Sequence, residues 1–122
     1  MQTKKKILLF DEQKNLSGLF RASLEPKGFL IEETNCCMEA STHIVKNDYE
    51  LLFIDLTLPD MKGFDLFQWL LGSSKHLTER VVFITSKPDQ ALDTKLKKIG
   101  RPYLSKPFSI KELSKAVSDV TN

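Results

Sequence analysis

Residues 51–66, LLFIDLTLPDMKGFDL, carry the pattern that decides the expected fold. The stretch begins with four consecutive apolar residues, 51–54, which is typical of a strand buried on both faces of a parallel sheet. Asp55 follows this strand directly. From Phe64 onward, apolar residues return at helical spacing, at positions 64, 67, 70 and 71. The stretch therefore predicts a buried strand, an acidic residue at its carboxyl end and an amphipathic helix.

Four further short apolar segments are expected to be strands of the same sheet: residues 6–10, 29–32, 81–84 and 102–104. The segments at 6–10 and 81–84 are continuously apolar, whereas those at 29–32 and 102–104 are weaker and suit the edges of the sheet. The five strands and the stretches between them predict a three-layer α/β fold, a doubly wound (βα)5 parallel sheet with helices on both faces and right-handed crossovers.

The helices expected between the strands have apolar residues at helical spacing. These positions are 16, 19, 20 and 24, with Ser23 at the same spacing; 40, 44 and 45; 64, 67, 70 and 71; 92, 96 and 99; and 113, 116, 117 and 120. The first helix should close at Pro26 and Gly28, and the fourth at Gly100. Ser109 and Glu112 have the spacing of a capping box and mark the start of the last helix.

The composition indicates one compact domain over residues 1–122, with 41% hydrophobic and 28% charged residues. A net charge of +2 is too small to imply nucleic-acid binding. The apolar runs are too short to span a membrane, and residues 1–6 lack a signal-peptide core, so we expect a cytoplasmic protein. Adjacent Cys36 and Cys37 form no metal-binding or redox CxxC pair and are expected to be reduced thiols.

Acidic residues follow two of the buried strands at the point where each ends. Asp11 and Glu12 come directly after the strand at 6–10, and Asp55 follows the strand at 51–54. In a doubly wound sheet, functional groups gather at the carboxyl ends of the strands, so these three carboxylates should converge. A cation would offset their mutual repulsion, and oxygen ligands of this kind suit Mg²⁺. The pattern therefore predicts a magnesium site.

A hydroxyl and an ammonium group follow two further strand ends. Thr85 directly follows the strand at 81–84, and Lys106 follows the last strand, in a Lys-Pro pair that restrains its backbone. Taken singly, an Asp or Thr at a strand end is usually a helix cap, and Lys-Pro is usually a solvated turn. Their arrival at one sheet edge favours a functional site instead.

With these motifs in place, the chain resembles a response-regulator receiver domain over essentially its whole length. The matching segments are KKILLFDEQ, LLFIDLTLPDMKGFDL, VVFITS and YLSKPF. The resemblance implies a flavodoxin-like strand order 2-1-3-4-5. It also implies that Asp55 is the phosphoacceptor, forming an aspartyl phosphate, while Thr85 and Lys106 contact the phosphoryl oxygens. Mg²⁺ would be held by Asp11, Glu12, Asp55 and the backbone carbonyl of Thr57.

The same resemblance implies a signalling role in a two-component phosphorelay. The donor would be a histidine kinase or a histidine phosphotransfer protein, and the domain would catalyse only its own phosphorylation and dephosphorylation. Movement of Thr85 and an inward turn of Tyr103 would switch the surface formed by the helix at 92–99, the last strand and the last helix. A downstream protein or an attached output domain would read that surface. The resemblance is also compatible with a dimer that forms on phosphorylation.

Two departures and three rival interpretations bear on this hypothesis. Glu12 stands where relatives usually have aspartate, which favours a degenerate receiver that serves only as a docking module. A haloacid-dehalogenase-type phosphatase would need a second aspartate at position 57, where the chain has Thr57. A flavin-binding relative of the fold would need a Ser-, Thr- and Gly-rich loop after the first strand, which residues 11–15 do not supply. The second departure from the usual pattern of the family is the stretch at 100–103, which is shorter than in many relatives. The chain is expected to be either a stand-alone regulator or a receiver excised from a longer protein.

Overall fold

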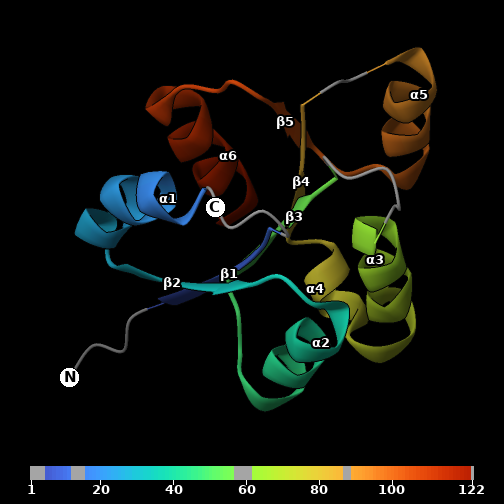
Figure 1. The fold of residues 1–122 in the computed structure, drawn as a ribbon, viewed down its shortest axis with the longest axis horizontal. Coiled ribbons are helices and arrows are strands. Elements are labelled where there is room, and N and C mark those ends of the chain that lie inside the picture. Colours follow the sequence, from blue (N-terminus) through green and yellow to red (C-terminus); the bar gives the residue numbers. More distant parts are fainter. Residues whose placement is uncertain (1–4, 12–15, 57–61, 87–88, 122) are drawn as a thin grey trace.

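The computed structural model describes residues 5–11, 16–56, 62–86 and 89–121. Within these residues, the strands form one parallel sheet in the order β2-β1-β3-β4-β5 (Figure 1). The strands are β1 (Lys5–Phe10), β2 (Phe29–Thr34), β3 (Leu51–Asp55), β4 (Val81–Thr85) and β5 (Tyr103–Ser105). The predicted fold class and strand order are confirmed, and the two weaker segments lie at the edges.

Helices connect the strands on both faces of the sheet. They are α1 (Ser17–Leu24), the 3₁₀ turn η1 (Glu25–Lys27), α2 (Cys37–Lys46), α3 (Lys62–Ser73), α4 (Lys75–Thr78), α5 (Gln90–Ile99) and α6 (Ile110–Thr121). The short helix α4 was not expected, because four residues cannot display a helical repeat of apolar positions. The buried side chains of Leu77 and Thr78 hold it against the rest of the domain. The helices predicted fourth and fifth are therefore α5 and α6.

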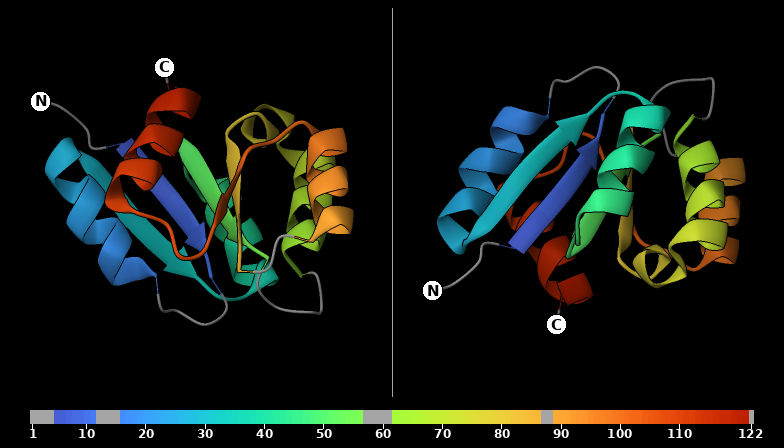
Figure 2. Two further views of the ribbon diagram at one scale, coloured as in Figure 1. Left: turned by 90° about the horizontal axis from the view of Figure 1, so that it is seen from above. Right: turned by 90° about the horizontal axis from the view of Figure 1, so that it is seen from below.

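Figure 2 shows helices on both sides of the sheet. Alternating side chains of the central strands divide the core into two layers between the sheet and these helices. On one face, Leu8, Leu52 and Phe83 pack with residues of α2, α3, α4 and α5. On the other, Leu9 and Phe53 pack with α1 and α6. Every residue of β3 and β4 is buried, which explains why these strands are continuously apolar rather than alternating.

Several of the predicted element boundaries are confirmed by their caps. Gly28 and Gly100 end η1 and α5 with φ of 95° and 81°, a left-handed conformation that suits glycine. At the start of α6, the Glu112 backbone N–H donates to Ser109 Oγ at 3.0 Å, and the Ser109 N–H donates to Glu112 Oε1 at 3.2 Å. This is the reciprocal capping box that the sequence predicts.

Strand β2 is longer than the apolar segment that predicts it. Its polar residues 32–34 continue to pair with β1, up to the register pair Phe10 and Thr34. Edge strands expose one side to solvent, so their polar residues can extend the pairing without an apolar run. In the part of the chain that the structure describes, no helix is long and apolar enough to cross a membrane.

The start of α3 lies unusually close to the end of β3. A Cβ atom added at Gly63 would lie 2.6 Å from Leu56 Cδ2, 2.7 Å from the Ile54 side chain and 3.2 Å from the Asp55 carbonyl oxygen. A glycine is therefore needed here for space. This close approach positions the helix directly beside the acidic end of β3.

Candidate functional site

Asp55 and Lys106 form the central contact of the site. Asp55 is the last residue of β3, and Lys106 directly follows β5. The Lys106 ammonium donates to Asp55 Oδ2 at 2.8 Å, and the side chains of Lys106 and Asp55 are 18% and 4% exposed respectively. The attraction between two charges this well shielded from water is stronger than in a surface pair, because water and salt screen it poorly. The structure thus brings these two predicted residues together.

Asp11 lies beside Asp55 at the same edge of the sheet. The register pairs Phe10 with Ile54, so the following residues of the two strands leave the sheet side by side. Asp11 is completely buried, and its Oδ2 accepts the Leu16 backbone N–H at 3.2 Å. Its own N–H donates to the Thr34 carbonyl at 3.0 Å. Backbone contacts therefore fix both the main chain and the carboxylate of Asp11.

Thr85 occupies the end of β4, the next strand along. It is 2% exposed, and its carbonyl accepts the Lys106 backbone N–H at 2.8 Å. The register places Thr85 opposite Ser105 on one side, and Ile84 opposite Asp55 on the other. Asp11, Asp55, Thr85 and Lys106 are thus positioned at one edge, as the sequence predicts. A cis peptide bond joins Lys106 to Pro107.

Two of the predicted metal ligands, Glu12 and Thr57, lie outside the described residues. Within the residues that are described, no group of three or more His, Cys, Asp or Glu side chains is placed to hold a metal ion. Asp11 and Asp55 nevertheless supply buried oxygen donors at neighbouring strand ends. Hard oxygen ligands of this kind fit Mg²⁺ rather than zinc or another softer metal.

Tyr103, the predicted switch residue, contacts helix α5. Its half-buried ring packs against the core layer that contains Phe83, and its hydroxyl donates to Asp93 Oδ1 at 3.0 Å. Asp93 Oδ2 also pairs with Lys97 at 3.0 Å. The hydrogen bonds from Lys97 and then Tyr103 lower the pKa of Asp93, and the bond to Asp93 raises the pKa of Tyr103.

Asp93 was not anticipated from the sequence. Its i,i+4 spacing to Lys97 signals a helical ion pair, but the spacing carries no hint of the contact with Tyr103 on another element. The lysines of α5 and α6, namely Lys95, Lys97, Lys98, Lys111 and Lys115, are exposed. They give these two helices a basic face in contact with solvent.

An apolar groove of about 440 Å³ adjoins the site. It is lined by Leu16 and Leu19 around the start of α1, and by Lys106, Pro107 and Phe108 after β5. Lys106 belongs both to this groove and to the contact with Asp55. A molecule seated in the groove would therefore lie next to the acidic edge of the sheet.

Comparison with known proteins agrees with this geometry. The family model described as "Response regulator receiver domain" matches residues 7–118 of the chain. The chain therefore belongs to this family: it is a receiver domain of a two-component response regulator. The acidic, hydroxyl and basic groups at the sheet edge are the kinds of group that the family resemblance led us to expect there.

Two curated relatives and one solved structure illustrate the similarity. The transcriptional regulatory protein RprY of Bacteroides fragilis is 31% identical over 115 residues, covering 93% of this chain and 48% of the relative. GltR of Pseudomonas aeruginosa, also a transcriptional regulatory protein, is 27% identical over 108 residues, covering 88% and 45%. The chain thus spans about half the length of these relatives.

The solved structure is the non-phosphorylated HemR receiver domain from Leptospira biflexa. It is 27% identical, with a TM-score of 0.82, and the match covers 98% of this chain and 95% of that one. The two proteins are therefore similar in the arrangement of their strands and helices as well as in sequence.

Proposed function

We propose that this receiver domain accepts a phosphoryl group on Asp55 in a Mg²⁺-dependent reaction, and that the resulting aspartyl phosphate switches its output surface. The contact of 2.8 Å between the buried Asp55 carboxylate and the Lys106 ammonium carries the proposal. This contact supports the proposal because a carboxylate oxygen and an ammonium group lie together at the sheet edge where ligands bind in this class of fold. The oxygen would act as the nucleophile, and the ammonium group would bind the phosphoryl oxygens.

In the proposed reaction, an Asp55 carboxylate oxygen attacks phosphorus, and the bond between phosphorus and the donor's histidine nitrogen breaks. The histidine keeps the electron pair of that bond. Lys106 then pairs with the phosphoryl oxygens, and the Thr85 hydroxyl donates a hydrogen bond to one of them. Little covalent chemistry is required of the protein beyond Asp55, so positioning and electrostatics supply most of the rate.

Asp11 and Asp55, together with Glu12 and the Thr57 backbone carbonyl, would hold the Mg²⁺ ion. When bound, the ion neutralises negative charge on the phosphoryl oxygens. Asp11 suits this role because it is buried and its carboxylate is fixed by the Leu16 N–H. The domain would act on no separate substrate, catalysing only its own phosphorylation and dephosphorylation.

The switch follows from the charge that phosphorylation adds, roughly one and a half to two negative charges at neutral pH. Thr85 moves toward the new oxygens, and Tyr103 turns into the space beside it. Both side chains face the same side of the sheet: Thr85 continues the row of Val81 and Phe83, and Phe83 is paired in register with Tyr103. The output surface would be α5, β5 and α6.

The donor would be a histidine kinase or a histidine phosphotransfer protein. Such a donor must cover the edge that carries Asp55, and the groove next to Lys106 offers it apolar surface. The two transcriptional regulators described above are about twice as long as this chain, which supports an output domain as one reader of the switch. A reducing cytoplasm suits the exposed Cys36 thiol, which forms no disulfide.

The test is incubation with Mg²⁺ and a small-molecule phosphodonor, followed by intact-protein mass spectrometry. We expect the addition of one phosphoryl group that is absent without Mg²⁺ and absent in Asp55→Ala. Asp65→Ala is the matched control, since Asp65 is an exposed acid on α3. Addition to the Asp55→Ala protein would refute the assignment of the acceptor.

The second candidate is a degenerate receiver that docks partners without being phosphorylated. Glu12 is the observation that favours it, because its longer side chain must be accommodated by an ion that demands near-ideal octahedral geometry. Glu12→Asp separates the two candidates. A protein that reacts only after this substitution would be a docking module in its natural form, whereas equal reaction of both would support phosphorylation.

A further inference from the structure

Helix α5 is held to the rest of the domain by few apolar contacts. Of its ten residues only Leu96 is buried, while Leu92 and Ile99 pack partly against the core. Figure 1 shows the helix at the periphery of the molecule, above α3 in that view. A helix with so little buried apolar surface depends on individual side-chain contacts to fix its position.

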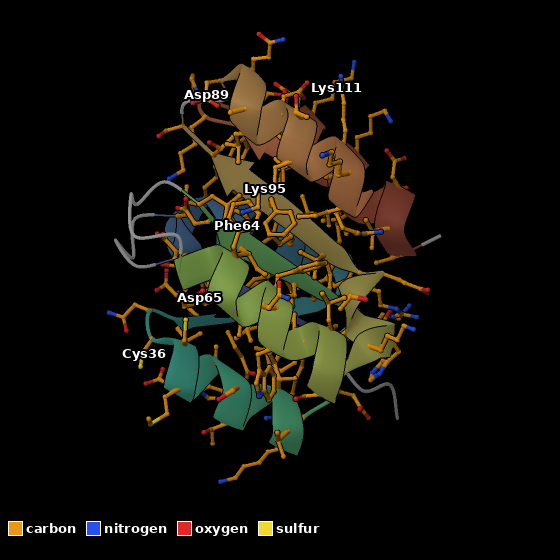
Figure 3. All side chains as sticks on the ribbon, turned by 90° about the vertical axis from the view of Figure 1, so that its right-hand side faces the viewer. Cys36, Phe64, Asp65, Asp89, Lys95 and Lys111 are labelled. Carbon is orange, nitrogen blue, oxygen red and sulfur yellow. The ribbon has the colours of Figure 1, made fainter. Side chains whose placement is uncertain are left out.

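Two polar contacts supply that attachment. The Lys95 ammonium lies 4.0 Å from the centre of the Phe64 ring on α3, a cation–π contact visible in Figure 3. On the other side, Asp93 accepts the Tyr103 hydroxyl of β5 at 3.0 Å. The first contact joins α5 to its neighbouring helix, and the second joins it to the residue proposed to move in the switch.

We propose that Asp93 acts as a latch: by accepting the Tyr103 hydroxyl, it holds that side chain toward α5 and away from Thr85. The role of the latch in signalling rests on the proposed function, whereas its control of the Tyr103 position does not. Tyr103 cannot turn toward Thr85 without giving up this hydrogen bond. Asp93 therefore sets the balance between the two positions of Tyr103.

Lys97 makes Asp93 a better latch. Its ammonium lies 3.0 Å from Asp93 Oδ2, which leaves Oδ1 directed at Tyr103. When Tyr103 leaves, Asp93 keeps this ion pair, so no bare charge remains on α5. The cost of opening the latch is then confined to one hydrogen bond, which suits a switch whose two states must differ by little.

Four variants test the latch: Asp93→Ala, Asp93→Asn, Tyr103→Phe and the double variant Asp93→Ala/Tyr103→Phe. The control is Asp119→Ala, because Asp119 forms the same i,i+4 pair with Lys115, at 2.7 Å, on α6. Beryllofluoride with Mg²⁺ serves as the phosphoryl analogue. An NMR signal from the isotope-labelled aromatic ring at position 103 reports the position of that side chain in every variant.

Removing the latch should make activation easier. We expect Asp93→Ala to lower the beryllofluoride concentration at half-saturation by about fivefold, the effect of one lost hydrogen bond. Asp93→Asn keeps an acceptor for the hydroxyl and should stay close to the wild type, as should Asp119→Ala. In the Tyr103→Phe background, Asp93→Ala should have no further effect. An equal effect in both backgrounds would overturn the latch, since Asp93 would then act without the hydroxyl.

The latch can also be judged without any phosphoryl analogue. In the unliganded protein, Asp93→Ala should shift the Tyr103 ring signal and bring the pKa of Tyr103 down toward its ordinary value. Asp119→Ala should change neither. If beryllofluoride fails to bind the wild type but these changes occur, the proposed function fails and the latch stands. If the Tyr103 signal and pKa are unaffected by Asp93→Ala, the latch is refuted.

Discussion

Asp55 and Lys106 are separated by 51 residues in the chain and by 2.8 Å in space, from a carboxylate oxygen to the ammonium nitrogen. The contact joins the end of a central strand to the residue after an edge strand. Because both groups are poorly exposed, each determines the electrostatic environment of the other.

Replacing Lys106 should therefore impair the reaction more than the fold. For Lys106→Met, which keeps the side-chain length but removes the charge, we expect the rate of phosphorylation by a small phosphodonor to fall about 100-fold. Stopped-flow measurement of the rate, with urea unfolding as a check on the fold, gives the comparison. The control is Lys115→Met, since Lys115 pairs with Asp119 on the exposed face of α6. A rate unchanged in Lys106→Met would contradict the assigned role.

Gly63→Ala should destabilise the protein, because its methyl group would overlap Ile54 and Leu56 at distances of 2.7 and 2.6 Å. Relief requires α3 to move from β3, at a cost of about 1–3 kcal/mol. The control lies in the same helix: an alanine at Gly72 meets nothing within 4 Å and should stabilise the helix by roughly 0.5–1 kcal/mol. Urea unfolding of both variants measures these effects, and equal signs would contradict the close approach.

Ser23→Ala should stabilise the protein. Ser23 is buried in α1, and within the described residues its hydroxyl has no hydrogen-bond partner. Removing an unsatisfied buried hydroxyl should raise the free energy of unfolding by about 1 kcal/mol. Thr78→Val is the contrasting variant, because the buried Thr78 hydroxyl donates to the Lys75 carbonyl at 2.5 Å. Thermal unfolding should show a higher midpoint for Ser23→Ala and a lower one for Thr78→Val.

The buried Tyr49 hydroxyl should make the protein less stable at alkaline pH. Burial, followed by the hydrogen bond to Glu32, raises the pKa of the Tyr49 hydroxyl above its ordinary value of 10.0. The unfolded chain then releases this proton at lower pH than the folded protein does, so unfolding becomes progressively easier as the pH rises above 10.0.

The measurement is the urea midpoint between about pH 8 and pH 11, with Tyr49→Phe as the comparison. The variant should lose less stability than the wild type over the upper part of this range, because it has no phenol to ionise there. Parallel pH profiles for the two proteins would show that Tyr49 does not contribute.

The sequence was sufficient to predict the fold and the residues at the sheet edge for a physical reason. Continuous apolar runs fix where buried parallel strands end, and Asp11, Asp55 and Thr85 stand directly at those ends. Lys106 is found in the same way, one residue beyond β5. Topology then brings the four together without further information.

Other features depended on packing that no local pattern encodes. The latch residue Asp93 meets Tyr103 across two elements, and the orientation of α5 that allows this follows from contacts such as Lys95 on Phe64. Helix α4 is too short to show a period. The predicted metal ligands Glu12 and Thr57 lie outside the described residues, so their roles stay predictions.

Strand β5 is only three residues long and forms an edge of the sheet, yet Lys106 follows it directly. Short edge strands fray more readily than central ones, because they have a single pairing partner. Each fraying event would carry Lys106 away from Asp55, while Asp55, the proposed acceptor, would stay in place. The ability of the domain to be phosphorylated would then depend on β5, the strand with the fewest pairing contacts. On heating, phosphorylation should therefore be lost at temperatures where most of the structure is still folded.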